Sequence, residues 1–204
     1  MDKYRIEIRE ALKNLSTEKL ILFAMLCCER LYPNYFLFSE ETGWGDNTVL
    51  IEGIDKIVEF LQSNELNENQ IKQIQNKIDS ITPSTEDFST ILVSFALDAC
   101  TSVYETLDFL LDPNIDKIVD VAIFARDTVD MFIQEKEMMD YTEPEFEIKI
   151  ENDPFMKNEK ARQVEHINKL VHNEITPDLI EKMRRQNLQN KIIDYSMIIN
   201  RNRT

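Results

Sequence analysis

Three aspartates are the residues of this chain whose type and placement best suit chemistry. Asp98 stands in an apolar stretch with helical periodicity, and Asp127 and Asp130 lie three residues apart in the next such stretch. If the two helices face each other with these residues inward, the carboxylates converge and could bind Mg²⁺ or Mn²⁺. This arrangement would suit a metal-dependent hydrolase of nucleotides or other phosphate esters.

The same three acids also have an interpretation that needs no metal. Buried acids are normally hydrogen-bonded or paired, so Asp98 would accept bonds from hydroxyls or a loop amide, and Asp130 would pair with Arg126. The all-α nucleotide pyrophosphatases that use such acids carry two acidic pairs on neighbouring helices. Here only Asp127 and Asp130 have that spacing, so the metal hypothesis is the alternative and no resident cofactor is the first expectation.

An aromatic stretch is the second candidate site. We expect the helix that begins after Ser16 to end before Pro33, because the residue before a proline disfavours helix, and residues 33–47 to form a loop. This stretch holds the chain's single tryptophan and two of its three glycines. The candidate binding residues there are Arg30, Tyr35, Glu40, Glu41 and Trp44.

Two interpretations of that stretch remain open. Arg30 could clamp the loop by binding Glu40, Glu41 or the last helical carbonyls, or it could contact an anionic ligand. The aromatic side chains could cover the helix ends, or several of them could be exposed and anchor a protein partner, because aromatic residues dominate interface energetics.

Other chemistries find little support in the sequence. His166 and His172 are six residues apart on a polar helix, which is not a metal-ligand spacing, and we expect both at the surface. Three glycines are too few to build a phosphate-binding loop. Three cysteines in apolar surroundings give no disulfide framework and indicate a reducing cytoplasm. The charged start does not resemble a signal peptide, and no apolar run is long enough to predict a membrane span.

Charge is distributed unevenly along the chain. The formal net charge is -15, which disfavours nucleic acids and anionic membranes as partners. Residues 1–154 carry 13 basic against 32 acidic residues, whereas residues 155–204 carry 10 basic against 6 acidic residues. We expect the basic C-terminal extension, residues 155–204, to pack on the acidic body, either within one chain or between subunits as a dimer through the C-terminal helix.

Helix signals predict an all-α, single-domain bundle over residues 1–204. Asn47, Asn67 and Thr176 are candidate N-caps, and Asp112 and Asp153 each precede a proline that suits the first helical position. We expect about seven or eight helices, with 84–111 and 112–140 as a central antiparallel pair. The alternation of acidic and apolar residues over 142–152 predicts an extended connection.

Several short segments resemble the YjaG-like family of bacterial proteins, known as domain of unknown function 416. The Arg-Leu-x-Pro-Asn-Tyr element at residues 30–35 is the most specific of them. The others are Phe38-Ser39-Glu40-Glu41-Thr42-Gly43, Ala96-Leu97-Asp98-Ala99, Ala125-Arg126-Asp127-Thr128-Val129-Asp130 and Asp153-Pro154-Phe155-Met156. The resemblance covers roughly residues 15–165 and implies a mostly helical cytoplasmic domain, but it implies no activity.

Two functional hypotheses follow. The first is a non-catalytic cytoplasmic protein that binds a protein partner or associates with itself, because no catalytic set is visible and an acidic surface would steer a basic protein. The second is the metal-dependent hydrolase built on Asp98, Asp127 and Asp130.

Overall fold

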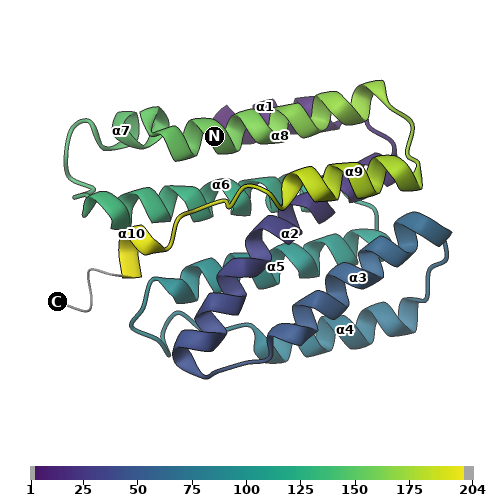
Figure 1. Cartoon of the computed structure of the whole chain (residues 1–204), viewed down its shortest axis with the longest axis horizontal. Coiled ribbons are helices and arrows are strands. Elements are labelled where there is room, and N and C mark those ends of the chain that lie inside the picture. The colour runs from purple at the N-terminus through teal and green to yellow at the C-terminus, as the bar shows by residue number, and fades with distance from the viewer. Residues whose placement is uncertain (1–2, 200–204) are drawn as a thin grey trace.

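Only helices form regular structure in the residues that the structure, a computed structural model, describes, which are residues 3–199 (Figure 1). This confirms the all-α fold class and the single helical domain. The helices are α1 (Lys3–Leu12), α2 (Thr17–Thr42), α3 (Asn47–Ser63), α4 (Glu68–Ile81), α5 (Leu92–Leu111), α6 (Ile115–Glu137), α7 (Phe146–Asn152), α8 (Pro154–His172), α9 (Pro177–Asn187) and α10 (Ser196–Ile199).

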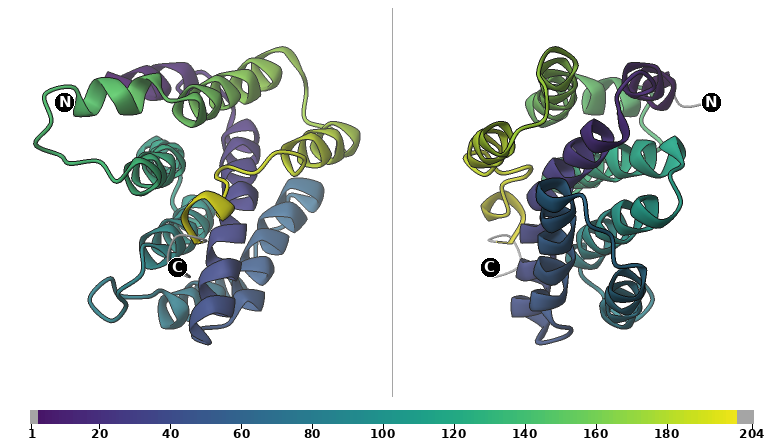
Figure 2. Two further views of the ribbon diagram at one scale, coloured as in Figure 1. Left: turned by 60° about the vertical axis from the view of Figure 1, so that its left-hand side comes forward. Right: turned by 90° about the vertical axis from the view of Figure 1, so that its right-hand side faces the viewer.

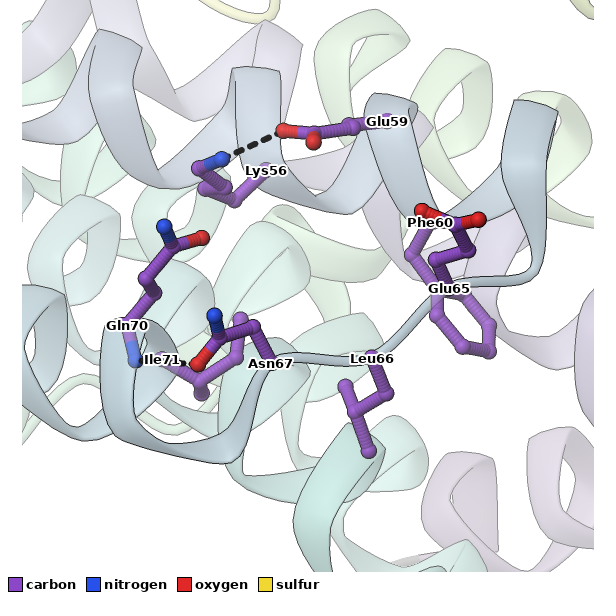
Figure 3. Close-up of a pocket in the computed structure, with 8 residues that line it drawn as sticks. All are labelled: Lys56, Glu59, Phe60, Glu65, Leu66, Asn67, Gln70 and Ile71. Carbon is purple, nitrogen blue, oxygen red and sulfur yellow. Dashed lines mark hydrogen bonds and ion pairs between the residues drawn. The ribbon is translucent and has the colours of Figure 1, made fainter.

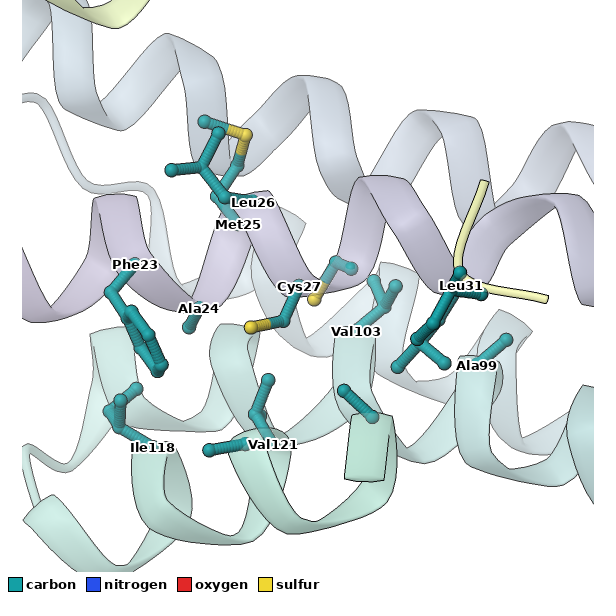
Figure 4. Packing of buried hydrophobic residues seen from close by; sticks show 14 of the residues in the cluster. Phe23, Ala24, Met25, Leu26, Cys27, Leu31, Ala99, Val103, Ile118 and Val121 are labelled. Atoms are coloured by element: carbon teal, nitrogen blue, oxygen red, sulfur yellow. The ribbon is translucent and has the colours of Figure 1, made fainter. Parts of the chain in front are cut away.

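Three long helices form the centre of the bundle. α5 packs against both α2 and α6, and α5 and α6 form the expected antiparallel pair across a short connection. Small and branched side chains fill their interface, as Figure 4 shows for Ala24 and Cys27 of α2 against Val103 and Val121. The α3–α4 hairpin and the α1–α8 pair lie at opposite ends of the molecule, with α5 and α6 between them (Figures 1 and 2).

The prediction that a loop begins at Pro33 is wrong, because α2 continues through the proline to Thr42. Pro33 removes one backbone donor, but the turns after it place Tyr35 and Phe38 in the core, where both are fully buried. Burial of these aromatic rings outweighs the local penalty. Gly43, with φ of 67°, ends the helix in the left-handed conformation that glycine adopts without strain.

Several helices begin at the N-caps that the sequence predicts, and two begin at a neighbouring residue. Ser16, Asn67, Asp153 and Thr176 stand at the predicted N-cap positions. Two caps are shifted: Asp46 replaces Asn47, and Asn114 replaces Asp112, whose backbone ends α5 instead.

The prediction of an extended connection over 142–152 is also wrong. This stretch contains α7, which places Ile150 in the core while leaving its acids in solvent.

One helix of the described chain, α2, has the length and apolar composition of a membrane span. In the fold, 78% of its most apolar window is buried inside the protein. The composition of α2 is therefore accounted for by its place at the centre of the bundle.

Close helix packing at α2 and α3 depends on two glycines. A Cβ on Gly45, where φ is 81°, would lie 2.1 Å from the hydroxyl oxygen of Tyr35. A Cβ on Gly53 would lie 2.7 Å from Cγ1 of Val103 on α5. Gly45 thus lets the α2–α3 connection pass close to Tyr35, and Gly53 lets α3 approach α5; a larger residue at either position would force a neighbouring side chain to move.

Candidate functional site

A polar seam is buried where α2 meets the C-terminal helices. Its central pair joins Arg30 of α2 to Glu159 of α8, and both guanidinium Nη atoms bond to the carboxylate. The two side chains are only 4% and 1% exposed. Arg30 therefore lies in mid-helix and binds Glu159, not Glu40 or Glu41, so the prediction of a loop clamp is wrong.

Neutral groups extend the seam from Glu159. The amide of Gln163 donates to Glu159, at 2.7 Å, and to the backbone carbonyl of Ala122 on α6, at 2.9 Å. Its carbonyl oxygen accepts a bond of 2.9 Å from the hydroxyl of Tyr4 on α1. One cluster of hydrogen bonds thus joins α1, α2, α6 and α8.

A second part of the seam joins α2 to α9 and the segment after it. Arg184 donates to the buried carboxylate of Glu29 across 2.6 Å, and the Asn187 amide donates to the Leu26 carbonyl across 2.8 Å. One turn further along α2, Asn34 accepts a hydrogen bond from the hydroxyl of Tyr195. Residues from the basic end of the chain thus lie directly against acidic and polar residues of α2.

Burial changes the proton affinities of the seam. The pKa of Arg30 falls to about 10 because the side chain is desolvated, so it remains charged at neutral pH. The pKa of His166 falls to about 3, because burial and the nearby Arg30 and Arg162 disfavour imidazolium. The prediction that His166 lies at the surface is wrong, since it is 5% exposed; His172 is exposed as predicted.

The remaining aromatic-stretch residues do not form a binding surface together. Tyr35 is fully buried and donates to the carbonyl of Ile81 across 3.0 Å. Trp44 is partly buried and packs edge-on against Phe38 and Phe88, with ring centroids 5.9 and 5.5 Å away. Glu40 and Glu41 are exposed at the end of α2. The aromatic side chains therefore close the end of the bundle, as the structural interpretation expected.

The three aspartates each have a protein partner. Asp98 accepts a hydrogen bond of 2.7 Å from Thr128, and desolvation raises its pKa to about 7. Asp127 pairs with Arg126 across 2.5 Å, and the Gln134 amide donates to Asp130 across 2.6 Å. Among residues 3–199 no group of three or more His, Cys, Asp or Glu residues could hold a metal ion. The hydroxyl partner predicted for Asp98 is confirmed, whereas Arg126 uses Asp127 as its partner.

The three thiols are buried, and burial raises the pKa of Cys27, Cys28 and Cys100 to about 12. They are therefore protonated at neutral pH, the form in which a cysteine is a poor nucleophile.

A polar groove of about 560 Å³ separates the ends of α3 and α4 (Figure 3). Three of its polar side chains already have local roles: Lys56 pairs with Glu59 across 2.5 Å, and Asn67 caps α4 by accepting from the backbone amide of Gln70. These contacts describe the surface of a helical hairpin and leave no converging set of free groups.

An acidic connection, residues 138–148, comprises the segment between α6 and α7 and the start of α7, and it projects at one end of the molecule (Figures 1 and 2). Met138, Tyr141 and Ile148 are 80%, 83% and 60% exposed. Six acidic residues and one lysine lie between positions 135 and 147. Exposed apolar side chains surrounded by carboxylates thus coincide in one surface element.

Sequence reasoning missed Glu159, Gln163 and His166. They occupy inward positions on α8 together with Met156, Ile167 and Leu170, at spacings of three or four residues. This period continues the apolar stripe of the helix, and it was the signal that could have placed them inside.

A family model and individual relatives indicate the same protein family. Residues 7–193 match the family model described as "Protein of unknown function (DUF416)". The Escherichia coli K12 "Uncharacterized protein YjaG" is 34% identical over 94 residues, which are 46% of this chain and 47% of that protein. A Haemophilus influenzae "Uncharacterized protein" is 26% identical over 141 residues, 68% of this chain and 71% of that one. The match to the Escherichia coli protein thus spans about half of its length.

A solved structure has the same fold. The crystal structure of a DUF416 family protein from Shewanella baltica OS155 is similar to this chain with a TM-score of 0.81 and 26% identity. The similarity covers 89% of this chain and 93% of that one.

Breaking the central pair of the seam should destabilise the fold strongly. Glu159→Gln leaves Arg30 buried without a counter-charge, and we expect it to lower the free energy of unfolding by about 3–5 kcal/mol. The double variant Arg30→Met, Glu159→Leu should lose less, because it removes both charges. The control Glu52→Gln breaks the exposed pair with Lys77 and should lose about 1 kcal/mol or less. Urea denaturation measures all three, and equal losses for E159Q and E52Q would contradict this account.

Replacing Asp98 should stabilise the fold in a pH-dependent way. The folded pKa of Asp98, about 7, lies above the ordinary value of 3.8, so the folded state favours the protonated carboxyl. The stability that this protonation contributes is present at low pH and is lost as the pH rises through 7. Asp98→Asn keeps an acceptor for Thr128 and removes the charge. The gain of D98N over the wild type should therefore grow by about 2 kcal/mol between pH 5 and pH 8.

Urea denaturation at the two pH values measures this gain. A gain that shrinks with rising pH would contradict the expectation. Stabilisation of the wild type by Mg²⁺ that D98N abolishes would support the metal hypothesis instead.

Proposed function

The chain belongs to the DUF416 family of proteins of unknown function, and we propose that it is a non-catalytic protein that binds a basic protein partner through its acidic connection. The observation that carries this proposal is the exposure of Met138, Tyr141 and Ile148 within a run of carboxylates. Large apolar side chains that stay in solvent and gather on one element commonly mark protein-binding surfaces.

Tyr141 is the best-placed anchor of this surface. It is 83% exposed, and tyrosine combines a large apolar ring with a hydroxyl that can bond to a partner. Met138, at φ of 50°, begins the connection in a left-handed conformation that residues other than glycine rarely adopt. This backbone turn ends α6, and the connection after it leaves Met138, Tyr141 and Ile148 in solvent while Met139 and Phe146 pack against the core.

The charge of the connection selects the partner. Of the acids between residues 135 and 147, Glu143 pairs with Lys149, and Glu137 lies 3.2 Å from Lys136. Asp140 caps the turn by accepting from the Thr142 amide at 2.8 Å, and it keeps its negative charge. Excess negative charge around apolar anchors complements a partner with basic residues around an apolar hollow, and it accelerates their encounter.

A hollow of about 350 Å³ beneath the connection strengthens this choice. Ile133 and Met139 contribute apolar surface to it, and three carboxylates line it beside one cation, Lys149. Glu143 pairs with Lys149, whereas Glu137 and Asp153 share Lys136, so the hollow keeps an excess of negative charge. Lysine and arginine combine an apolar stem with a cationic head, so a side chain of either kind from the partner suits such a hollow.

The non-catalytic part of the proposal rests on how the polar groups are used. The buried acids and the buried arginine bind one another or neighbouring hydroxyls and amides, and the thiols are protonated. Buried, free thiols also suit the reducing cytoplasm, where we place the protein. Nucleic acids and anionic membranes are unfavourable partners for a chain with a net charge of -15.

The two alternative functions, a metal-dependent hydrolase and a self-associating protein, have less structural support. The hydrolase hypothesis, with Mg²⁺ or Mn²⁺ as cofactor, gains no support from the positions of Asp98, Asp127 and Asp130. Self-association through the C-terminal helix remains a prediction, and Arg184 of α9 already uses its charge on Glu29 within the same chain.

Site-specific crosslinking tests the proposal. A photoreactive phenylalanine analogue at position 141 should form an adduct with a basic protein in cells, whereas the same analogue at Leu188, which is 62% exposed on α9's C-cap, should not. Once that protein is purified, Tyr141→Ala should weaken binding about tenfold or more, and Leu188→Ala should leave it unchanged. Binding should also weaken as salt is added.

Three results would overturn the proposal. Identical adducts from positions 141 and 188 would show non-specific contact. Absence of an adduct at 141 would remove the docking surface. An adduct with a second copy of this chain would point to self-association instead.

A further inference from the structure

We propose that a cleft between α8 and the segment after α9 binds a small oxyanion, the phosphate or carboxylate group of a metabolite. The cleft has a volume of about 420 Å³ and is lined by Arg30 at its buried end and by Arg162 and Lys191 nearer the surface. Pockets of about 300–1,000 Å³ are the usual size for small-molecule sites. This cleft is separate from the acidic connection and takes a ligand of the opposite charge.

Two cations of the cleft have no hydrogen-bond or ion-pair partner in the part of the chain that the structure describes. Within residues 3–199, neither Arg162 nor Lys191 makes a hydrogen bond or an ion pair, although both line the same hollow. Two unpaired cations on facing segments are therefore available to an anion.

Arg30 adds an unsatisfied donor at the buried end of the cleft. Its two Nη atoms bind Glu159, but its Nε has no hydrogen-bond partner although the residue is only 5% exposed. A buried donor without an acceptor is unfavourable. An oxyanion bound beside the Arg30 guanidinium would supply the acceptor that Nε lacks.

Neutral groups suit the remainder of a ligand. Asn158 and Asn190 line the cleft with side-chain amides that make no hydrogen bond in the described chain, and such amides donate to phosphate or carboxylate oxygens. Phe155 and Ile192 add apolar surface, which the organic part of a metabolite can cover.

The carboxylates of the cleft are already neutralised. Glu159 is bound by Arg30, and Glu165 pairs with Lys169 across 2.7 Å. The unpaired charge in the cleft is therefore positive. Burial is the main reason for the low pKa of the neighbouring His166, and the nearby cations Arg30, Arg162 and Lys169 lower it further.

Calorimetric titration tests this site directly. Sodium phosphate and sodium acetate are titrated separately into the full chain at constant ionic strength, and we expect saturable binding of at least one of them. Arg162→Gln and Lys191→Gln should each weaken that binding about tenfold or more, because each removes a charge-assisted hydrogen bond. The anion that binds more tightly identifies the ligand group as phosphate or carboxylate.

Lys157→Gln is the matched control, since Lys157 is an exposed cation on α8 that does not line the cleft. It should bind as the wild type does. Among residues 3–199 none of the three substituted side chains has a hydrogen-bond or ion-pair partner, so thermal unfolding should show intact folds. Absence of saturable binding by both anions would overturn the proposal, as would equal affinities for R162Q, K191Q and K157Q.

Discussion

One buried ion pair, between Arg30 of α2 and Glu159 of α8, constrains the rest of the structure. Both side chains are almost completely removed from water, and neither charge is tolerable there without the other. The pair can form only if α8 packs on the side of α2 that carries Arg30. The carboxylate also accepts from Gln163, which bonds in turn to Tyr4 and to the Ala122 carbonyl, so this one contact fixes the relative positions of four helices.

The seam explains how a chain of strongly uneven charge forms a single helical domain. Arg184 of α9 binds Glu29 of α2, and the hydroxyl of Tyr195 donates to Asn34 of α2. Part of the basic C-terminal charge is therefore neutralised by the acidic body within the same chain. Charged side chains that are not paired in the seam lie at two other places on the surface. Carboxylates remain around the apolar residues of the acidic connection, and unpaired cations remain in the cleft beside α8. The two proposed binding surfaces are therefore opposite in sign.

Local signals in the sequence were sufficient for the fold class and for several helix starts. Caps such as Asn67 and Asp153 act on amides two or three residues away, and that short range makes them readable from sequence. The course of α2 through Pro33 was not readable, because burial of Tyr35 and Phe38 depends on α4, α5 and the 82–91 segment, which are distant in sequence. His166 was misplaced for a different reason: its helix is polar in composition, and the three- or four-residue period that His166 shares with Met156, Gln163 and Leu170 was overlooked.

The sequence identified some residues of the candidate site but not the contacts that they make. Arg30 was identified as a residue of interest, yet its partner lies 129 residues away and was not identified from sequence. Asp98 was identified as a buried acid with a hydroxyl partner, and the structure supplies that partner in Thr128. The acidic connection was visible as an alternating pattern, but the exposure of Tyr141 and Met138 follows from the turn after α6, which the pattern does not encode.

Native-state amide hydrogen exchange tests the central role of the seam most directly. If the buried pair couples α8 to the core, the slowest amides of α8 around Glu159 and Gln163 should exchange with the same opening free energy as those of α2 around Arg30, and that free energy should equal the free energy of global unfolding. If α8 instead exchanges through a separate opening of much lower free energy while α2 stays protected, the ion pair does not hold the structure together and the account is wrong.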